Sequence, residues 1–268
     1  MTKINSVKSF ATKYGLKIFA ICFWLLFWEL ISGRASIAGY AFLLPSPATV
    51  LIALFQLGAT LDFWQTIWFS FARIVFGFFL ALAVGTALAI GASLSQVVKE
   101  LISPVLKVIK ATPVASFIIL ALMYISTNNL SVAISFLMVL PMVYANVYQG
   151  IKSTDTKLLE MSKVFHLSNW KKIRAIYIPA VMPHFVSAVS VGIGFSWKAG
   201  VAAEVIGYPN GSIGERLYEA KLYYMFPELF AWTVVIIIIS ILFEKAVLML
   251  LGLVQQDSSR KNNSHLEG

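Results

Sequence analysis

Long apolar runs separated by short polar segments dominate the pattern along this chain. A helix needs about 20 apolar residues to cross a bilayer, and most of these runs approach or exceed that length. They lack the alternation of apolar and polar residues that is typical of barrel strands. We therefore predict an all-α, polytopic membrane protein with six transmembrane helices, at Ile18–Ile31, Thr66–Ala92, Pro104–Ile125, Leu130–Tyr148, Ile176–Val201 and Leu229–Leu251.

The composition supports this fold class. The mean hydropathy is +0.82 and only 12% of the residues are charged, whereas a soluble domain has about 25%. The first apolar run follows a basic N-terminus, as in a signal peptide, but no small-residue cleavage site follows it, so we interpret it as an uncleaved span. A single cysteine, Cys22, excludes an intrachain disulfide.

The formal net charge of +9 raises the possibility of a nucleic-acid partner, but the placement of the basic residues argues against it. Lysine and arginine gather between the apolar runs, as the positive-inside rule describes. Of the 21 basic residues, sixteen fall on one predicted side. This places both termini in the cytoplasm and makes membrane lipid, not nucleic acid, the expected partner of these charges. The segments are the N-terminus, Ser93–Lys110, Ile151–Ala175 and the tail from Lys245.

The two long loops on the other side each contain a signal for a short interfacial helix. One follows Ser46-Pro47, and the other starts at Ser212 after the turn residues Pro209–Gly211. We divide the chain into residues 1–65, a core at 66–252 and a disordered cytoplasmic tail at 253–268. Five aromatic residues fit an interfacial belt: Trp64, Trp68, Tyr223, Tyr224 and Trp232.

The segment between the fourth and fifth runs has a helical pattern of its own. Leu158, Met161 and Phe165 have the spacing of one helix face, with Asp155 as a reasonable N-cap. Ser168 is the expected N-cap of a second helix that continues into the fifth span. Two interpretations remain open: an interfacial helix held by lysines on anionic lipid, or a docking element for a cytoplasmic partner.

This segment resembles the cytoplasmic loop of binding-protein-dependent ABC importer permeases. The family pattern is E-A-A, three residues, G, nine residues, I-x-L-P. Here the same positions read Glu160-Met161-Ser162, His166 and Ile176-Tyr177-Ile178-Pro179, so both alanines and the glycine are replaced. Other stretches look similar to the family too: LPSPATV at 44–50, Thr66-x3-Ser70-x2-Arg73-x3-Gly77-Phe78, KATPVASF at 110–117, LPMVYANVYQG at 140–150 and Trp197-x6-Glu204.

The resemblance implies the type I ABC importer permease fold in a bacterial inner membrane. It implies a dimer, expected to be a homodimer, that works with two ABC ATPase subunits and an extracytoplasmic substrate-binding protein. ATP and magnesium would be bound by the ATPase, and no cofactor by this chain. Each ATPase would receive one amphipathic coupling helix, here near 155–167, and switch the permease between inward and outward access. By position, the coupling residues are Glu160, Met161, Ser162, Phe165, His166, Ile176 and Pro179.

The subgroup that the motifs most resemble serves nitrate, sulfonate, taurine, bicarbonate and some pyrimidine vitamin precursors, which implies a small and anionic solute. His166 stands where the family has a glycine that adopts positive φ, so the turn there is strained or different. Two other interpretations of the chain are a self-sufficient secondary transporter and a non-transporting scaffold or sensor subunit.

No enzymatic motif appears in the chain. It has no P-loop and no G-x-S-x-G elbow, and His166, His184 and His265 lack the spacing of metal ligands. We expect no catalytic residue and no metal site, and therefore no enzyme activity of this chain alone.

Charged residues inside spans are candidates for the solute pathway. These are Lys198, Glu204 and Arg73, although Lys198 can also snorkel or pair with a buried acid and Arg73 can tie helices together. Pro113 and Pro141 should kink the third and fourth spans and free carbonyl groups, or serve packing alone. The polar pathway candidates near these bends are Thr112, Ser116 and Asn146.

Overall fold

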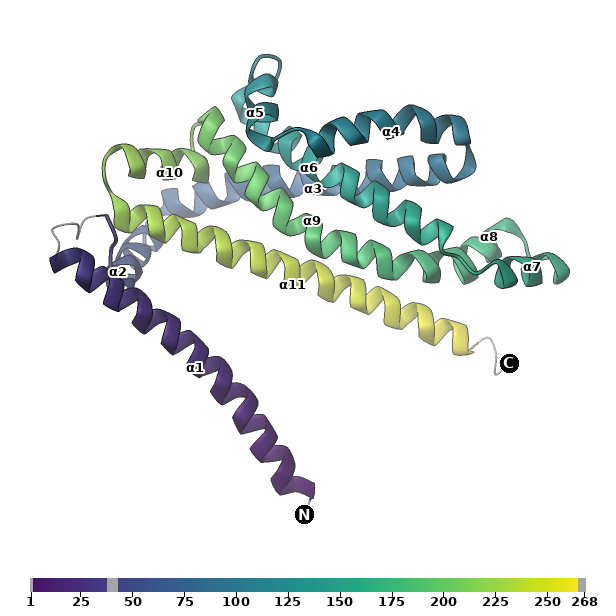
Figure 1. Ribbon diagram of the computed structural model, residues 1–268, viewed down its shortest axis with the longest axis horizontal. Helices are drawn as coiled ribbons and strands as arrows, with labels where there is room; N and C mark the ends of the chain where they lie inside the picture. Colours follow the sequence, from purple (N-terminus) through teal and green to yellow (C-terminus); the bar gives the residue numbers. More distant parts are fainter. Residues whose placement is uncertain (1, 38–42, 265–268) are drawn as a thin grey trace. The chain divides into compact units, whose positions relative to one another are not determined.

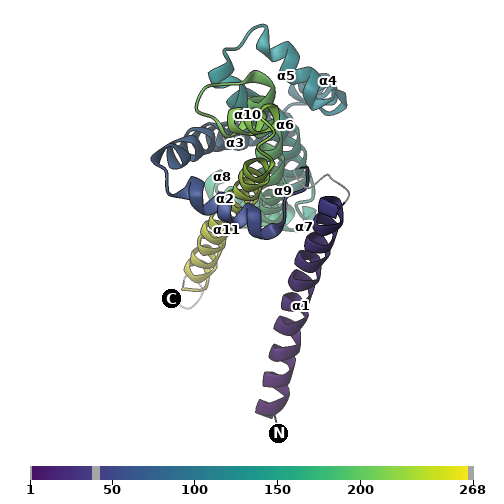
Figure 2. The same ribbon diagram turned by 90° about the vertical axis from the view of Figure 1, so that its left-hand side faces the viewer.

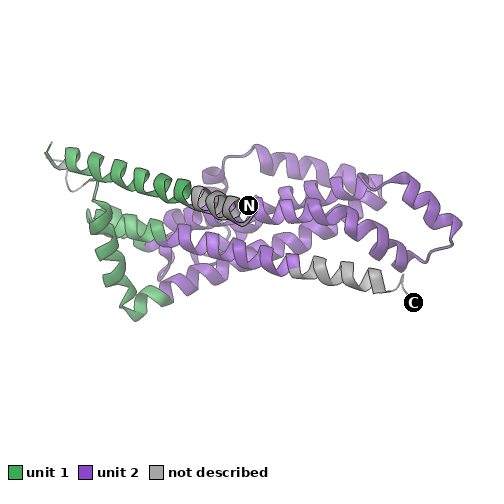
Figure 3. Cartoon of the chain, turned by 90° about the horizontal axis from the view of Figure 1, so that it is seen from below, with its two compact units in different colours: residues 1–64, 216–234 green, residues 65–215, 235–268 purple. Residues whose placement is uncertain are grey.

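Helices account for every regular element in the described part of the chain. The computed structural model describes residues 2–37 and 43–264, with side chains at 15–35, 37 and 43–252. The chain forms two compact units, residues 1–64 with 216–234 (unit 1) and residues 65–215 with 235–268 (unit 2) (Figure 3). The elements in Figure 1 are α1 (Thr2–Ile37), α2 (Pro47–Gly58), α3 (Leu61–Leu94), α4 (Gln96–Ala111), α5 (Val114–Leu122), α6 (Thr127–Lys152), α7 (Thr156–Val164), α8 (Asn169–Lys172), the π-helix η1 (Ile173–Tyr177), α9 (Ile178–Gly207), α10 (Ile213–Leu222) and α11 (Phe226–Ser264).

Five helical stretches are long and apolar enough to cross a membrane, and a bent pair supplies the sixth span when it is counted as one. The pair is α4 and α5, which meet at 104°. The other five predicted spans are each present as an unbroken helical stretch with wider bounds. The five unbroken stretches are Gly15–Ala35, Leu61–Leu94, Thr127–Lys152, Asn169–Gly207 and Phe226–Gly252.

The third predicted span, Pro104–Ile125, needs correction. Its first helix starts at Gln96, where Ser95 accepts a hydrogen bond from the Val98 amide, and Pro104 lies inside that helix. The chain breaks completely at Thr112, whose ψ of 131° is extended. Proline disfavours the helical conformation of the residue before it, so Pro113 ends α4 instead of only kinking the span.

Helix α6 contains Pro141 within a continuous helix, so this proline does not end the span as Pro113 does. One other boundary differs from the prediction. Helix α11 runs to Ser264, past the predicted end of the last span and into the segment that was expected to be disordered. No proline or glycine follows Gly252 until the final residue, so the local sequence contains no helix breaker there. Residues 265–268 lie outside the described part.

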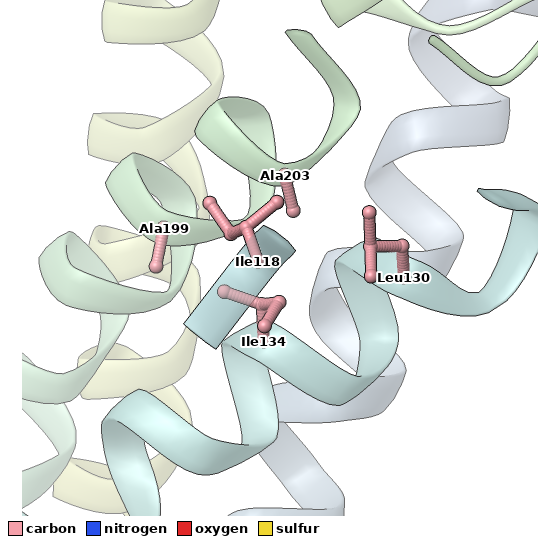
Figure 4. Packing of buried hydrophobic residues seen from close by; sticks show 5 residues of the cluster. All are labelled: Ile118, Leu130, Ile134, Ala199 and Ala203. Atoms are coloured by element: carbon pink, nitrogen blue, oxygen red, sulfur yellow. The ribbon is translucent and has the colours of Figure 1, made fainter. Parts of the chain in front are cut away.

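Unit 2 is built on close packing of α3, α6 and α9. A β-carbon on Gly77 of α3 would overlap the Val132 carbonyl of α6, so only glycine allows this approach. A buried cluster joins α5, α6 and α9 (Figure 4) and lets their backbones pack tightly. It contains Ile118, Leu130, Ile134, Ala199 and Ala203.

The helices of unit 2 give it two distinct ends. The α3–α4 turn, α7 and α8 lie together at one end, and the α9–α10 turn lies at the opposite end (Figure 1). Figure 2 shows the same helices after a turn of 90°. Basic segments predicted to be cytoplasmic therefore share one end of this unit.

Unit 1 contains the first of the two predicted short helices, α2. Ser46 is its N-cap and accepts a hydrogen bond from the Thr49 amide, with Pro47 at the first helical position. Trp28 of α1 donates its indole N–H to the Pro45 carbonyl at 3.1 Å. The second predicted short helix is also present, as α10.

Candidate functional site

The segment α7 is a short capped helix with an exposed apolar face. The Asp155 side chain accepts a hydrogen bond from the Lys157 amide at 2.8 Å, as expected for the N-cap. Leu158, Met161 and Phe165 are 42%, 49% and 69% exposed. This face has the spacing that the sequence predicted, and it has no cover within the described chain.

His166 closes α7 in the left-handed conformation, with φ of 49°. The Leu167 amide donates to the Ser162 carbonyl at 2.9 Å, and the His166 amide donates to the Lys163 carbonyl at 3.1 Å. This pair of bonds is the Schellman motif, in which glycine usually takes the position of His166. The backbone therefore forms the same turn that glycine would form. His166 adopts a left-handed conformation there that is strained for a residue with a side chain.

The predicted coupling residues divide into an exposed and a buried set. Ser162 is fully buried and donates to the Leu159 carbonyl at 2.7 Å, and Ile176 is also buried. These two buried side chains are therefore not available for contact with another protein. Sequence reasoning missed Val164, which is 74% exposed beside the apolar face. The exposed set is Glu160, Met161, Phe165, His166 and Pro179.

One helical stretch leads from this segment to the opposite end of unit 2. Ser168 caps it by accepting a hydrogen bond from the Lys171 amide. From Asn169 to Gly207 the chain stays helical for 39 residues. A π-helical turn at Ile173–Tyr177 interrupts its α-helical register near the α7 end. Such turns are rare and occur frequently at functional sites.

Glu204 lies at the far end of this stretch and is fully buried. Its Oε2 accepts hydrogen bonds from the Ser70 hydroxyl of α3 at 2.7 Å and from the Gly214 amide of α10 at 3.3 Å. The Ser70 oxygen in turn accepts the Ile213 amide at 2.9 Å. The first turn of α10 is thus attached to both α3 and α9.

Glycine is required at position 214 for this attachment. A β-carbon there would overlap the main chain of Glu204 and Val205. Ser212 caps α10 by accepting from the Glu215 amide at 3.0 Å, and the Glu215 carboxylate accepts from the Gly211 amide. We call Ser70, Glu204 and Gly214 the buried polar node.

The other two charged pathway candidates do not join this node through hydrogen bonds. Arg73 donates from Nε to the Asn128 carbonyl at 2.5 Å and stacks on the Phe69 ring. Arg73 thus connects α3 to the start of α6, as expected for the alternative in which it ties helices together. Lys198 is exposed, and none of the ion pairs among the described residues includes it.

The polar candidates near the bends make local hydrogen bonds. Thr112 donates to the Val108 carbonyl at 2.8 Å, and Asn146 donates to the Met142 carbonyl at 2.9 Å. Ser116 is exposed. Sequence reasoning assigned no role to Ser70, although it lies one helical turn after Thr66, and a polar pair at this spacing in an apolar helix was an available signal.

A small cavity of about 210 Å³ lies in unit 1, between the α2–α3 junction and α10–α11. Arg216 lines this cavity and forms ion pairs with Asp62 at 2.8 Å and with Glu219 at 3.2 Å. The Phe63 and Trp232 rings lie 4.9 Å apart on its wall. The ion pairs connect α10 to the start of α3 within this unit.

Comparison with known proteins connects the chain to membrane transport. The family model described as "Binding-protein-dependent transport system inner membrane component" matches residues 74–259. The putative aliphatic sulfonates transport permease protein SsuC of Bacillus subtilis is 23% identical over 224 residues, which cover 83% of this chain and 80% of that protein. The bicarbonate transport system permease protein CmpB of Synechocystis is 26% identical over 216 residues, which cover 76% and 75%.

A solved structure has a similar arrangement of helices. It is a chain of the MetNI methionine ABC transporter in an inward-facing conformation. The TM-score is 0.51 at 17% sequence identity, over 70% of this chain and 93% of that one. At this identity the similarity concerns the fold alone.

Proposed function

Because the chain belongs to the family of binding-protein-dependent transport system inner membrane components, we propose that it carries a small anionic solute inward. A separate ATPase would bind α7 and drive this transport. The fold of this chain is that of a type I ABC importer permease. Two copies would form the pathway, and an extracytoplasmic binding protein would deliver the solute. The ATPase would hold ATP and magnesium.

The observation that carries this proposal is the uncovered apolar face of α7 at one end of unit 2. Leu158, Met161 and Phe165 form an exposed apolar helix face of the kind that docks into a protein groove. The Schellman turn at His166 fixes the direction in which the chain leaves this face. Basic residues of 151–175 lie at the same end, which the positive-inside rule assigns to the cytoplasm.

Purification of the tagged chain from its native membranes tests the ATPase contact. We expect an ABC ATPase to co-purify, and we expect Phe165→Asp to reduce its recovery at least tenfold by placing a charge in the groove. The matched control is Phe55→Asp on α2, a phenylalanine that is 78% exposed in unit 1. Equal loss with both variants, or no ATPase with the unmodified chain, would contradict the proposal.

The class of solute rests on the two named relatives, whose printed substrates, aliphatic sulfonates and bicarbonate, are both anions. Lys198 supports an anionic solute, since it is an exposed cation in a span and forms no ion pair with a described acid. In proteoliposomes, Lys198→Gln should lower anion uptake several-fold and Lys198→Arg should retain it. Lys221→Gln, at the end of α10, is the control and should transport normally.

A further inference from the structure

Two lysine side chains from different helices of unit 2 lie beside one tyrosine ring. The Lys99 ammonium of α4 is 5.9 Å from the centre of the Tyr148 ring, and the Lys152 ammonium in the last turn of α6 is 5.8 Å from it. Both distances are within the range of a cation–π contact. Helix α4 starts at the α3–α4 turn and α6 ends shortly before α7 (Figure 1). Both lysines therefore lie at the end that the positive-inside rule assigns to the cytoplasm.

Neither lysine forms an ion pair with an acid of the described chain. The ion pairs among the described residues include neither Lys99 nor Lys152. Glu100, which follows Lys99, is exposed and accepts a hydrogen bond from the Gln96 side chain at 2.7 Å. Lys99 is half-buried, and lysine is seldom buried without a partner. The two positive charges repel each other at this ring, and an anion held between them would offset that repulsion.

Structural roles account for each lysine singly but not for the pair. Lys152 in the last turn of α6 interacts favourably with the helix dipole, and Lys99 can snorkel toward water. Neither role requires side chains of two separate helices to approach the same ring. A basic pocket between membrane helices on the cytoplasmic side is the kind of site that holds the headgroup of an anionic lipid.

The surface of α4 favours a lipid over a free anion. Val97, Leu101 and Val105 are 69%, 68% and 57% exposed, and their spacing places them on one face of the helix. Lys99 lies on another face of the same helix. Helix α4 thus presents exposed apolar side chains for acyl chains close to a cation for a headgroup, as interfacial helices do. A free phosphate ion would need only the cation.

We infer that Lys99, Lys152 and Tyr148 form a binding site for the phosphate headgroup of an anionic phospholipid. The two ammonium groups donate hydrogen bonds to phosphate oxygens, and charge-assisted bonds of this kind are stronger than neutral ones. The Tyr148 ring keeps both ammonium groups in place by cation–π attraction. The bound lipid connects the start of α4 to the end of α6.

Native mass spectrometry tests this site on the full-length chain, purified with the subunits that accompany it. The probes are phosphatidylglycerol, which is anionic, and phosphatidylcholine, whose choline neutralises the phosphate, at equal concentration. We expect the chain to prefer phosphatidylglycerol. The double variant Lys99→Gln/Lys152→Gln should weaken its apparent affinity about tenfold, because both cations that attract the headgroup are lost. Equal retention of the two lipids by the unmodified chain would overturn the inference.

The matched control is the double variant Lys107→Gln/Lys110→Gln. It removes the same charge from exposed lysines of α4 that form no cation–π contact among the described residues. The control should change the affinity for phosphatidylglycerol by less than about twofold. Equal losses in the two double variants would overturn the inference, because they would show a general attraction of positive charge and no defined site.

Two further measurements separate a lipid from a free anion and a lost site from a misfolded chain. Millimolar inorganic phosphate should not displace phosphatidylglycerol, and displacement would overturn the assignment to a lipid. Lys152 is exposed, so Lys152→Gln alone is a mild variant that decides the matter if the double variant fails to fold. It should weaken binding about threefold, whereas Lys152→Arg should retain it. Unchanged binding by Lys152→Gln would overturn the inference, whether or not an ATPase accompanies the chain.

Discussion

The two ends of the long helical stretch from Asn169 to Gly207 are stabilised in opposite ways. At the α7 end, apolar side chains are exposed and the backbone is strained at His166, where φ is 49°. At the Glu204 end, a charged side chain is buried and bonded to two other helices. The first end leaves an apolar face uncovered by the described chain, while the second is completed by its own chain. One helical stretch therefore has an end that is available for a partner and an end that is fixed by hydrogen bonds to neighbouring helices.

The largest effect should come from crowding the Glu204 end. Gly214→Ala places a methyl group against the main chain of Glu204 and Val205, so α10 must move away from α9. We expect the free energy of unfolding to fall by about 3 kcal/mol, as overpacking does in a rigid core. Thermal unfolding in detergent measures this loss.

Gly194→Ala in α9 is the matched control, because nothing lies within 4 Å of a β-carbon at that position. It should leave stability unchanged or raise it slightly, by up to about 1 kcal/mol, since alanine is the better helix former. Equal losses for the two variants would show that the node is not tightly packed.

An intermediate effect should come from charges at the α7 end. Glu160 and Lys163 are both exposed and lie three residues apart on α7. If α7 couples to an ATPase as proposed, we expect Glu160→Ala to lower binding-protein-stimulated ATP hydrolysis several-fold. Lys163→Ala should change it by less than about twofold, because the proposed role of Lys163 is only to add positive charge on the side that the positive-inside rule assigns to the cytoplasm. Negligible effects of both would argue against the coupling role of α7.

The smallest effect should come from relieving the strained turn. His166→Gly removes a left-handed penalty of about 1 kcal/mol but adds flexibility to the unfolded chain, so the turn should gain only about 0.5 kcal/mol. Hydrogen exchange of the Leu167 amide, which donates to Ser162, should slow about twofold. His166→Ala keeps the penalty and should show no such slowing.

The same contrast explains what the sequence could reveal. The α7 end depends on residues close together in the chain, so the spacing of Leu158, Met161 and Phe165 predicted its apolar face. His166 marked the position of the turn but left open whether the turn is strained or different. The fold class and five unbroken helical spans followed from apolar runs alone. Break positions were less predictable, since the effect of Pro113 depended on the conformation of Thr112.

The Glu204 end could not be predicted in the same way. Glu204 was recognised as a charge near a span end, but its partners Ser70 and Gly214 come from other helices. Ser131 belongs to a third helix, and its polar neighbour Ser135 one turn later marks a polar face there without naming its partner. One sequence without an alignment does not tell which of several buried serines faces a given carboxylate. Arg73 and Lys198 were both candidates as ionisable residues in spans, and the structure shows that Arg73 bonds the start of α6 while Lys198 is exposed.

The π-helical turn at Ile173–Tyr177 affects the angle at which α7 is rotated about the axis of α9. A π turn contains one residue more than the α-helical turn it replaces, and each residue of an α-helix turns the chain by about 100°. Deleting one residue there would restore a regular α-helix and swing α7 by about that angle around the axis of α9. The apolar face of α7 would then point away from the proposed ATPase with every side chain intact, so the proposed contact depends on the length of this turn.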